Sequence, residues 1–262
     1  MLENMSEKYT ITKYTNEEFL EVEDVIVNEF PLTVFLNDEE FATIVCTPTN
    51  FEEMVVGFLA SEGAIRFYSD IDSISIDESR GYAYVKLKAA TVTSQEYYSK
   101  RFIGSCCGKS RQFYFHNDAK TAKTSTSTTT ISAAQCIRLM NEMQNSSEVF
   151  QETGGVHNAA LCTPEEMVAV RTDIGRHNAL DKLFGYSIMN RVSVRDKIIV
   201  FSGRISSEVL LKAAKIGVGI VLSKSAPTDL AIKLANDLNI TAVGFIRGKS
   251  FNIYSCPERI TK

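Results

Sequence analysis

Two adjacent cysteines offer the most distinctive chemistry in this sequence. They lie in the run Ile103-Gly104-Ser105-Cys106-Cys107-Gly108-Lys109-Ser110-Arg111. Small residues of this kind predict a turn, whereas a core cysteine usually lies within an apolar run. Nearby cations lower the pKa of a thiol, and the thiolate is its nucleophilic form. The run therefore predicts an exposed loop with a reactive thiolate at Cys107, where Gly108 leaves the sulfur open to approach.

The spacing of the two cysteines favours chemistry at a single sulfur. One peptide unit holds adjacent cysteines in poor geometry for a disulfide. The residue three positions after Cys107 is Ser110, which has no thiol to resolve a mixed disulfide. A persulfide on one cysteine is compatible with this pattern. The alternative is that both cysteines are small, half-buried and inert, and turn composition alone leaves both interpretations open.

Three turns in the second half of the chain carry serine, glycine and cations directly after apolar strands. They are Ser202–Ser207, Ser223–Thr228 and Ile246–Ser250. Ligands of open α/β sheets bind at the carboxyl ends of the strands. The turns therefore predict a site for an anionic, phosphate-bearing ligand. The first turn, Ser202–Ser207, lacks the Gly-Lys-Ser/Thr ending of a P-loop, so it does not support ATP hydrolysis.

A repeated triplet contributes two of the three histidines. His157-Asn158-Ala159 recurs as His177-Asn178-Ala179, each time after a glycine turn. Asp173 and Arg176 accompany the second copy, and a helix N-terminus with such side chains can bind an anion. The alternative is an asparagine cap beside a buried, hydrogen-bonded histidine. The histidines and cysteines lack zinc-ligand spacing, so we expect no metal held directly by the protein.

The elements that would position these residues fall into two groups. The first group predicts a small α+β unit with a helix over 51–62 and strands over 8–14, 24–28, 32–36, 41–46, 71–77 and 82–87. Later segments alternate strand and helix, which is typical of α/β folds. Between them, Asn117–Thr130 is polar and rich in threonine and serine. We predict an α/β protein with a small domain over 1–116, a flexible linker over 117–130 and an α/β domain over 131–262.

Composition narrows the class of protein. The chain has 262 residues, of which 44% are hydrophobic. Its formal net charge of −4 does not indicate a protein that binds nucleic acid. It contains no apolar run long enough to span a membrane. The start Met1-Leu2-Glu3-Asn4 lacks the apolar core of a signal peptide. We therefore expect a cytoplasmic protein with free thiols.

Several segments together resemble the FdhD family of formate dehydrogenase accessory proteins. They are Ser105–Arg111, Thr153–His157, Asp173–Lys182, Ser202–Arg204 and Ser223–Thr228. The resemblance covers nearly the whole chain, and the run Asp173–Lys182 is its most specific part. It implies a C-terminal domain that resembles the cytidine deaminase fold without its zinc site.

The resemblance also implies a function. It implies a sulfur carrier, or sulfurtransferase, that takes persulfide sulfur from a cysteine desulfurase. The sulfur passes to the molybdenum cofactor, bis-molybdopterin guanine dinucleotide, before the cofactor enters formate dehydrogenase. Cys107 matches the first cysteine of the family loop, and Ser110 departs from the second. The family also suggests a homodimer.

The resemblance further assigns a cofactor-binding segment near the C-terminus. It matches Phe245, Ile246, Arg247, Gly248, Lys249 and Ser250. Two hypotheses follow for the whole chain. The first is a sulfurtransferase with Cys107 as persulfide carrier. The second is a non-catalytic chaperone that holds the cofactor for formate dehydrogenase maturation, with the cysteines only shaping the loop.

Overall fold

The computed structural model describes residues 5–88 and 122–262, together with the backbone of 101–103. The predicted cysteine loop, including Cys106 and Cys107, lies outside the described residues. So does the first part of the predicted linker. None of the helices in the described part of the chain is both long and apolar enough to cross a membrane.

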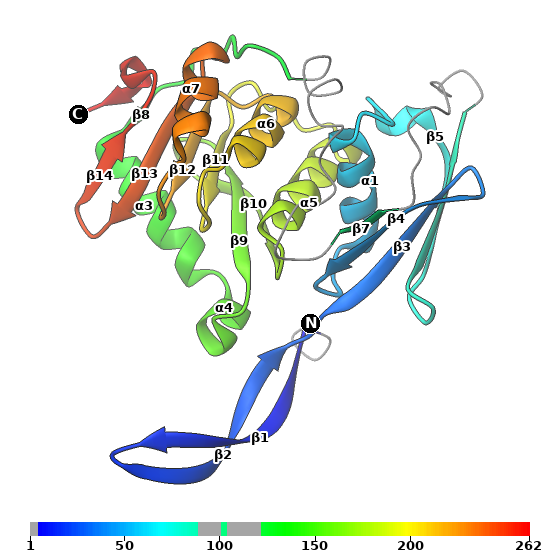
Figure 1. Cartoon of the computed structure of the whole chain (residues 1–262). Coiled ribbons are helices and arrows are strands. Elements are labelled where there is room, and N and C mark those ends of the chain that lie inside the picture. Colours follow the sequence, from blue (N-terminus) through cyan, green and yellow to red (C-terminus); the bar gives the residue numbers. More distant parts are fainter. Residues whose placement is uncertain (1–4, 89–100, 104–121) are drawn as a thin grey trace.

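The chain begins with a projecting hairpin. β1 (Ser6–Thr15) and β2 (Glu18–Val27) pair in antiparallel register along their full length. Asn16 and Glu17 both have positive φ, 51° and 66°, as a two-residue hairpin turn of matching twist requires. This two-stranded sheet extends away from the rest of the molecule (Figure 1). We call residues 6–27 the arm.

The first globular unit is a sheet covered by one helix. Its strand order is β5-β6-β3-β4-β7, formed by β3 (Phe30–Leu36), β4 (Glu39–Cys46), β5 (Ile71–Asp77), β6 (Tyr82–Leu87) and β7 (Arg101–Ile103). Helix α1 (Phe51–Ser61) packs on one face, and a short 3-10 turn, η2 (Tyr68–Asp70), leads into β5. Alternation along β3 buries Leu32, Val34 and Leu36 against the helix. The strands predicted over 32–36, 41–46, 71–77 and 82–87 and the helix over 51–62 are confirmed, and in the arm the strand predicted over 24–28 proves to begin at Glu18.

The second unit is built on a six-stranded sheet. Its order is β10-β9-β11-β12-β13-β14, formed by β9 (His157–Cys162), β10 (Met167–Asp173), β11 (Ile198–Phe201), β12 (Ile220–Ser223), β13 (Thr241–Arg247) and β14 (Ser250–Ile253). The three strands β11, β12 and β13 are parallel, and the outer strands are antiparallel to their neighbours. A second small sheet joins β8 (Ile131–Ser132) to β15 (Ile260–Thr261), which follows the 3-10 turn η5 (Pro257–Arg259).

Helices cover both faces of this sheet. Ile198 and Val200 of β11 point to the face covered by α3 (Ala133–Asn145). Ile199 and Phe201 point to the opposite face, covered by α5 (Arg176–Met189), α6 (Ser207–Ile216) and α7 (Asp229–Asp237). The predicted α/β class is therefore confirmed as a mixed α/β fold. The finer resemblance to a cytidine deaminase fold stays a prediction.

The repeated triplet lies in two different local structures. The polar turn before residues 179–183 predicts a helix from Ala179, but α5 begins at Arg176, so His177 and Asn178 belong to its first turn. The matching pair His157-Asn158 begins strand β9, so the repeated triplet does not repeat its geometry. A short helix, α4 (Glu148–Thr153), was also missed. Six residues give too little periodicity to separate a helix from a turn.

The second part of the predicted linker, residues 122–130, has neither helix nor strand but lies along the second unit. The amide of Ser125 donates to the carbonyl of Leu238 over 2.8 Å, and the side chain of Asn239 donates to the carbonyl of Ser125 over 2.9 Å. The Ser127 hydroxyl donates to the carbonyl of Arg195 over 2.8 Å. The domain boundary and the mobility of the linker stay predictions.

Candidate functional site

The polar turns expected from sequence meet at one edge of the six-stranded sheet. This edge comprises the carboxyl ends of β10 to β13 and the start of β9, which runs antiparallel to β11. We call it the carboxyl edge; it is the lower edge of the sheet in Figure 1. Five cationic residues lie at or just after the strand ends that form this edge: Arg176, Arg204, Lys224, Arg247 and Lys249. Such an edge suits an anionic ligand.

Hydroxyl groups fix the first two turns of the carboxyl edge. Ser202 Oγ accepts a hydrogen bond from the Asn158 amide over 3.0 Å and lies 3.3 Å from His157 Nδ1. The Ser223 hydroxyl donates to the carbonyl of Gly203 over 2.7 Å and accepts from the Ser225 amide over 2.9 Å. The two turns are thereby held side by side.

His157 contributes hydrogen bonding rather than charge. Burial lowers its pKa below the ordinary value of 6.5, and the nearby Arg176 guanidinium lowers it further, while Asp173 opposes both. Its ring stacks against Phe201 with 6.5 Å between centroids. We therefore expect a neutral imidazole at pH 7 in a fixed position beneath the turn that begins at Ser202.

The predicted cofactor segment, Phe245 to Ser250, forms the tip of the β13–β14 hairpin beside these turns. The Phe245 amide donates to the carbonyl of Ser225 over 3.2 Å. Phe245 has a φ of 55°, uncommon for a bulky residue, and its side chain is 37% exposed. The Arg247 guanidinium lies over the Phe245 ring, 5.5 Å from its centroid. Ile246, in contrast, is buried in the core.

This hairpin tip can do two things chemically. An exposed aromatic face can stack a planar heterocycle, and the cations Arg247 and Lys249 can make charge-assisted hydrogen bonds to phosphate. Backbone strain that persists in an exposed bulky residue is typical of ligand-binding positions. Of the six residues predicted here, Ile246 is therefore a core residue, and the other five are exposed or partly exposed.

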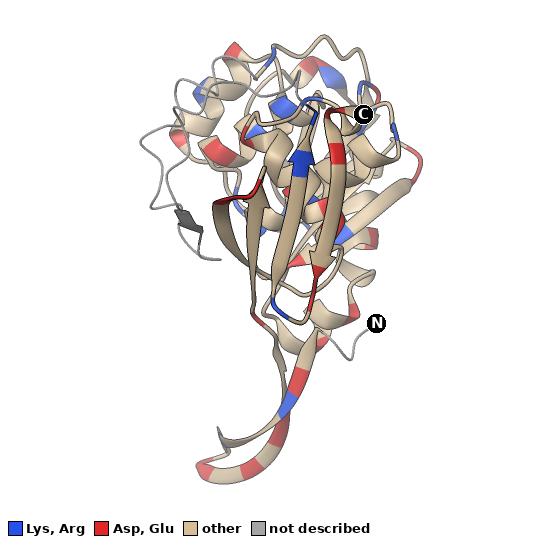
Figure 2. Ribbon diagram, turned by 90° about the vertical axis from the view of Figure 1, so that its right-hand side faces the viewer, with Lys and Arg blue, Asp and Glu red and all other residues tan. Residues whose placement is uncertain are grey.

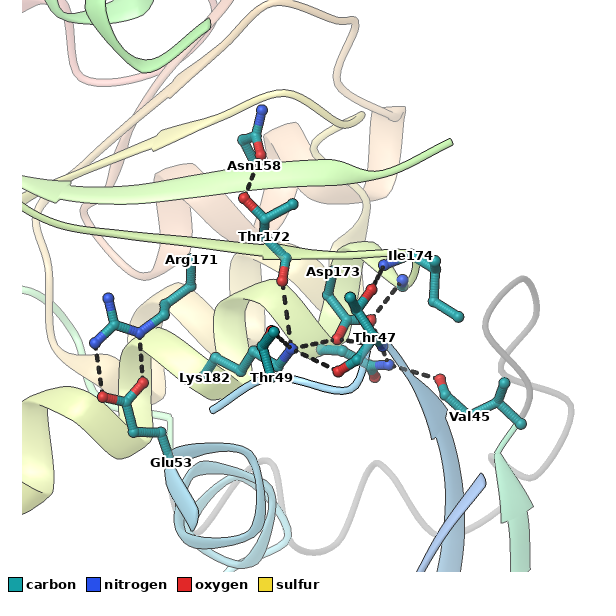
Figure 3. Close-up of polar contacts among 12 residues, drawn as sticks. Val45, Thr47, Thr49, Glu53, Asn158, Arg171, Thr172, Asp173, Ile174 and Lys182 are labelled. Atoms are coloured by element: carbon teal, nitrogen blue, oxygen red, sulfur yellow. Dashed lines mark hydrogen bonds and ion pairs between the residues drawn. The ribbon is translucent and has the colours of Figure 1, made fainter. Parts of the chain in front are cut away.

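The run Asp173–Lys182 serves a different purpose from the one expected. The Lys182 ammonium and the Asp173 carboxylate form an ion pair of 2.8 Å, and both side chains are 0% exposed. Lys182 Nζ also donates to the carbonyl of Thr47 (3.1 Å) and to Thr49 Oγ1 (3.2 Å) in the first unit. Figure 3 shows these contacts converging between the two units.

Asp173 satisfies both of its oxygens in the same place. Oδ2 accepts from the Thr47 amide over 3.0 Å, and Oδ1 accepts from the Gly175 amide (2.8 Å) and from Asn178 Nδ2 (2.9 Å). Asn178 Nδ2 donates in addition to the carbonyl of Val45 over 2.8 Å. Of the two interpretations left open for this cluster, internal hydrogen bonding holds for Asp173, because its carboxylate is buried, negative and fully engaged. His177 lies nearby with Nε2 3.1 Å from Glu208 Oε2.

The two units are also joined by a close crossing of α1 and α5. A Cβ at Gly57 would lie 1.8 Å from the carbonyl oxygen of Asp181, and one at Gly185 would lie 1.8 Å from that of Glu53. Arg171 adds a two-pronged ion pair to Glu53, with 2.6 Å between Nη2 and Oε1. We call these contacts, together with the Asp173–Lys182 pair, the junction. Sequence reasoning missed it, although a glycine inside each helix was its visible signal.

A second buried ion pair lies at the junction. Asp181 of α5 pairs with Lys212 of α6, and the Ser61 hydroxyl of α1 donates to Asp181 Oδ1 over 2.6 Å. The Lys215 ammonium donates to the carbonyl of Ser61 over 2.7 Å. Three helices from the two units are therefore tied through one carboxylate.

The described cysteines divide into inert and accessible groups. Burial raises the pKa of Cys46, Cys136 and Cys162 to about 12. Such thiols hold too little thiolate to react at neutral pH. Cys256 is half-buried, with its Sγ 3.6 Å from Asn239 Oδ1. Within the described ranges, no group of three histidine, cysteine or acidic residues is arranged to hold a metal ion.

Comparison with solved structures supports the fold. A crystal structure from Desulfotalea psychrophila, described provisionally as a formate dehydrogenase accessory protein, superposes with a TM-score of 0.82. It is 24% identical in sequence, and the match covers 98% of this chain and 99% of that one. The likeness extends over both units and establishes the architecture.

Sequence relatives match over nearly their whole length. Proteins named sulfur carrier protein FdhD are 65% identical in Halalkalibacterium halodurans (95% of this chain, 93% of the relative) and 62% in Geobacillus kaustophilus (95% of each). The namesake in Bacillus subtilis is 60% identical (98% of this chain, 99% of the relative). A model described as the FdhD/NarQ family matches residues 27–261. The chain therefore belongs to the FdhD/NarQ family.

Proposed function

We propose that this chain is a sulfur carrier in the maturation of formate dehydrogenase. It accepts persulfide sulfur from a cysteine desulfurase and passes it to bis-molybdopterin guanine dinucleotide, the molybdenum cofactor that it holds as a substrate. The observation that carries the proposal is the 65% identity, over 252 residues, to a protein named a sulfur carrier. We further propose a cytoplasmic homodimer, as the family resemblance suggests.

Cys107 is the proposed carrier, and the described cysteines support it by exclusion. A carrier needs an accessible thiolate, and burial denies this to Cys46, Cys136 and Cys162. Cys256 follows β14 and has its thiol at the side chain of Asn239 rather than in a cationic turn. Cys107 has Lys109 and Arg111 close in sequence, which favour its thiolate.

The transfer step on Cys107 balances without a further reactant. The Cys107 thiolate attacks the outer sulfur of the desulfurase persulfide and forms a new S–S bond. The S–S bond of the donor breaks, and the desulfurase cysteine leaves as a thiolate. The proton of the Cys107 thiol is lost before attack, which is why a low pKa at this position matters. The cysteine now carries the sulfur atom for delivery.

The carboxyl edge is the proposed binding site for the guanine dinucleotide part of the cofactor. The exposed ring of Phe245 offers a stacking face for the base, and Arg247 and Lys249 offer donors for the phosphates. The turns at Ser202 and Ser223 lie beside them and extend the polar surface. The hairpin tip therefore supplies recognition, whereas Cys107 supplies the sulfur.

The direct experiment is to incubate the chain with a cysteine desulfurase and cysteine and to measure its intact mass. We expect the added mass of one sulfur atom, sensitive to a thiol reductant, on the proteolytic fragment that contains Cys106 and Cys107. Cys256→Ala is the matched control and should load as wild type. A chain that binds the cofactor but never gains sulfur would be a non-catalytic chaperone, and the carrier proposal would be wrong.

A further inference from the structure

The arm exposes an unusual amount of apolar surface for its size. Its exposed large side chains include Phe19 (75%), Tyr14 (62%) and Tyr9 (51%), with Leu20 and Ile26 also exposed. Two strands alone are marginally stable in water, and this sheet has no third strand among the described residues. A projecting ribbon of this kind is typical of a surface that binds another chain.

Both faces of the arm carry exposed apolar side chains: Tyr14 and Phe19 lie on one face, and Tyr9, Leu20 and Ile26 lie on the other. The register pairs Tyr9 with Asp24, Ile11 with Val22 and Lys13 with Leu20, so these residues share a face. At the base of the arm, Tyr9 and Ile26 of this face line a hollow of about 570 Å³ against the first unit. Phe30, Phe51 and the carboxylates of Glu7, Glu29 and Glu78 also line it. The hollow thus combines aromatic walls with three carboxylates, and none of the described residues that line it is a cation.

The charge of the arm selects the kind of partner. Residues 6–27 hold six carboxylates and two lysines, a formal −4, which equals the net charge of the whole chain. Four of these carboxylates lie on β2: Glu18, Glu21, Glu23 and Asp24. Figure 2 shows acidic residues along the projecting hairpin. Carboxylates on an open edge repel an identical edge, so they disfavour pairing with the arm of a second copy and attract a cationic strand.

The base of the arm adjoins the carboxyl edge. Val27 packs on the loop that enters β9, where a Cβ at Gly155 would lie 2.7 Å from Val27 Cγ1. His157 begins β9 two residues later. The family model begins at residue 27, where the arm ends, so the arm lies outside the region that the model matches. A partner held by the arm would be positioned next to the cationic turns.

We propose that the arm and the hollow at its base dock an extended segment of a partner protein. The segment is apolar on one face and carries lysine or arginine, and it adds as a third strand to the open edge of β2. Main-chain hydrogen bonds along β2 and burial of Tyr9 and Ile26 hold the segment, and the carboxylates select its charge. The proposal does not depend on the sulfur-carrier function.

The test uses the full chain and a fluorescent peptide of alternating lysine and valine, with the length of β2, 10 residues. Fluorescence anisotropy should show saturable binding, roughly tenfold or more tighter than binding of an alternating glutamate and valine peptide. The double variant Glu21→Gln/Glu23→Gln removes two carboxylates from the face opposite Tyr9 and Ile26, where the lysines of the bound peptide would lie, and should weaken binding about two- to tenfold. The control Glu165→Gln/Glu166→Gln removes the same charge from the exposed β9–β10 connection and should bind as wild type.

Hydrogen exchange distinguishes strand addition at β2 from non-specific attraction between charges. Sedimentation shows whether the arm instead joins two copies of this chain. Bound peptide should slow amide exchange along β2, and Tyr9→Ser/Ile26→Ser should abolish this protection in a chain that remains folded. No saturable binding, equal loss in the control variant, or protection spread over the acidic surface would overturn the proposal. Dissociation of a dimer by the arm variants would also overturn it, because the arm would then be an interface between copies of this chain.

Discussion

The junction and the carboxyl edge use similar residue types in opposite environments. At the junction, Lys182 and Asp173 are fully buried, and the groups around them come from both units. At the carboxyl edge, Arg247 and Lys249 are exposed, and no acidic partner is recorded for either of them among the described residues. The same chemistry that locks two units together in one place is left open to a ligand in the other.

This difference shows that the most specific motif of a family can have a structural role rather than a ligand-binding one. The run Asp173–Lys182 is the most specific part of the family resemblance. Its two charged end residues, however, bind each other and neighbouring groups inside the protein. A buried ion pair costs much of its Coulombic gain in desolvation, so its role is to fix an arrangement rather than to add stability. At the junction, the arrangement that is fixed is the position of the first unit against β10 and α5.

The largest expected effect comes from closing the space between α1 and α5. In Gly185→Val the new side chain would meet the backbone of Glu53, where even a Cβ would lie 1.8 Å from the carbonyl oxygen. Backbone cannot yield like a side chain, so we expect a loss of more than about 3 kcal/mol of unfolding free energy, or failure to fold. Chemical denaturation measures it.

Gly154→Ala is the matched control for that substitution. Gly154 has a φ of 62° but nothing within 4 Å of its Cβ position. Only conformational strain remains there, worth about 1 kcal/mol. Equal stability losses at the two glycines would mean that the helix crossing does not constrain the junction.

Breaking the buried pair is the next largest effect. Lys182→Met leaves the Asp173 carboxylate buried without its cation, which should cost about 3–5 kcal/mol of unfolding free energy. Asp173→Asn/Lys182→Met removes both charges and should recover part of that loss. If the double variant is no more stable than Lys182→Met, the pair is not the source of the effect.

Weakened ligand binding is the third effect, and it leaves the fold intact. Arg247→Ala and Lys249→Ala should each weaken binding of guanosine diphosphate about ten- to a hundredfold in calorimetry, because each removes a charge-assisted hydrogen bond of roughly 1.5–3 kcal/mol. Lys233→Ala, an exposed cation on α7, is the control and should bind as wild type. Unchanged affinity in both variants would move the site to the turns at Arg204 or Lys224.

The smallest expected effect concerns the three buried thiols, which should not react with an alkylating reagent at neutral pH. Burial raises the pKa of Cys46, Cys136 and Cys162 to about 12, so their thiolates form in the folded chain only as pH approaches that value. The raised values also mean that the stability these thiols contribute below pH 9 is lost as pH rises from about 9 toward 12. At pH 8, iodoacetamide should leave the thiols of Cys46, Cys136 and Cys162 unmodified until denaturant is added. Rapid labelling of any one in the folded chain would place it among the carrier candidates.

Sequence predicted elements well where a pattern repeats locally. Alternation in Ile71–Asp77 and an apolar run such as Lys197–Phe201 each depend on neighbours along the chain. The turns after β11 and β12 were also found, since small residues after an apolar strand mark the edge of a sheet. These signals were enough to place the candidate anion site on the carboxyl edge.

The junction could not be predicted in the same way. Thr47 and Lys182 are 135 residues apart in the sequence, and nothing local indicates that one will donate to the other. Lysine and aspartate in a polar run look like solvent-exposed or ligand-binding residues until tertiary packing buries them. The arm shows the same limit, because its strands were visible in sequence while its projection from the molecule was not.

The central claim is that Cys107 carries the sulfur, and the most direct test compares two neighbouring thiols. Cys107→Ala and Cys106→Ala are each loaded with a desulfurase and cysteine and then used to activate sulfur-free formate dehydrogenase. General damage to the loop would affect both alike. We predict that Cys107→Ala abolishes activation and that Cys106→Ala retains a measurable part. Activation at the wild-type level by Cys107→Ala would contradict the assignment, and full activation by both variants would contradict the carrier function itself.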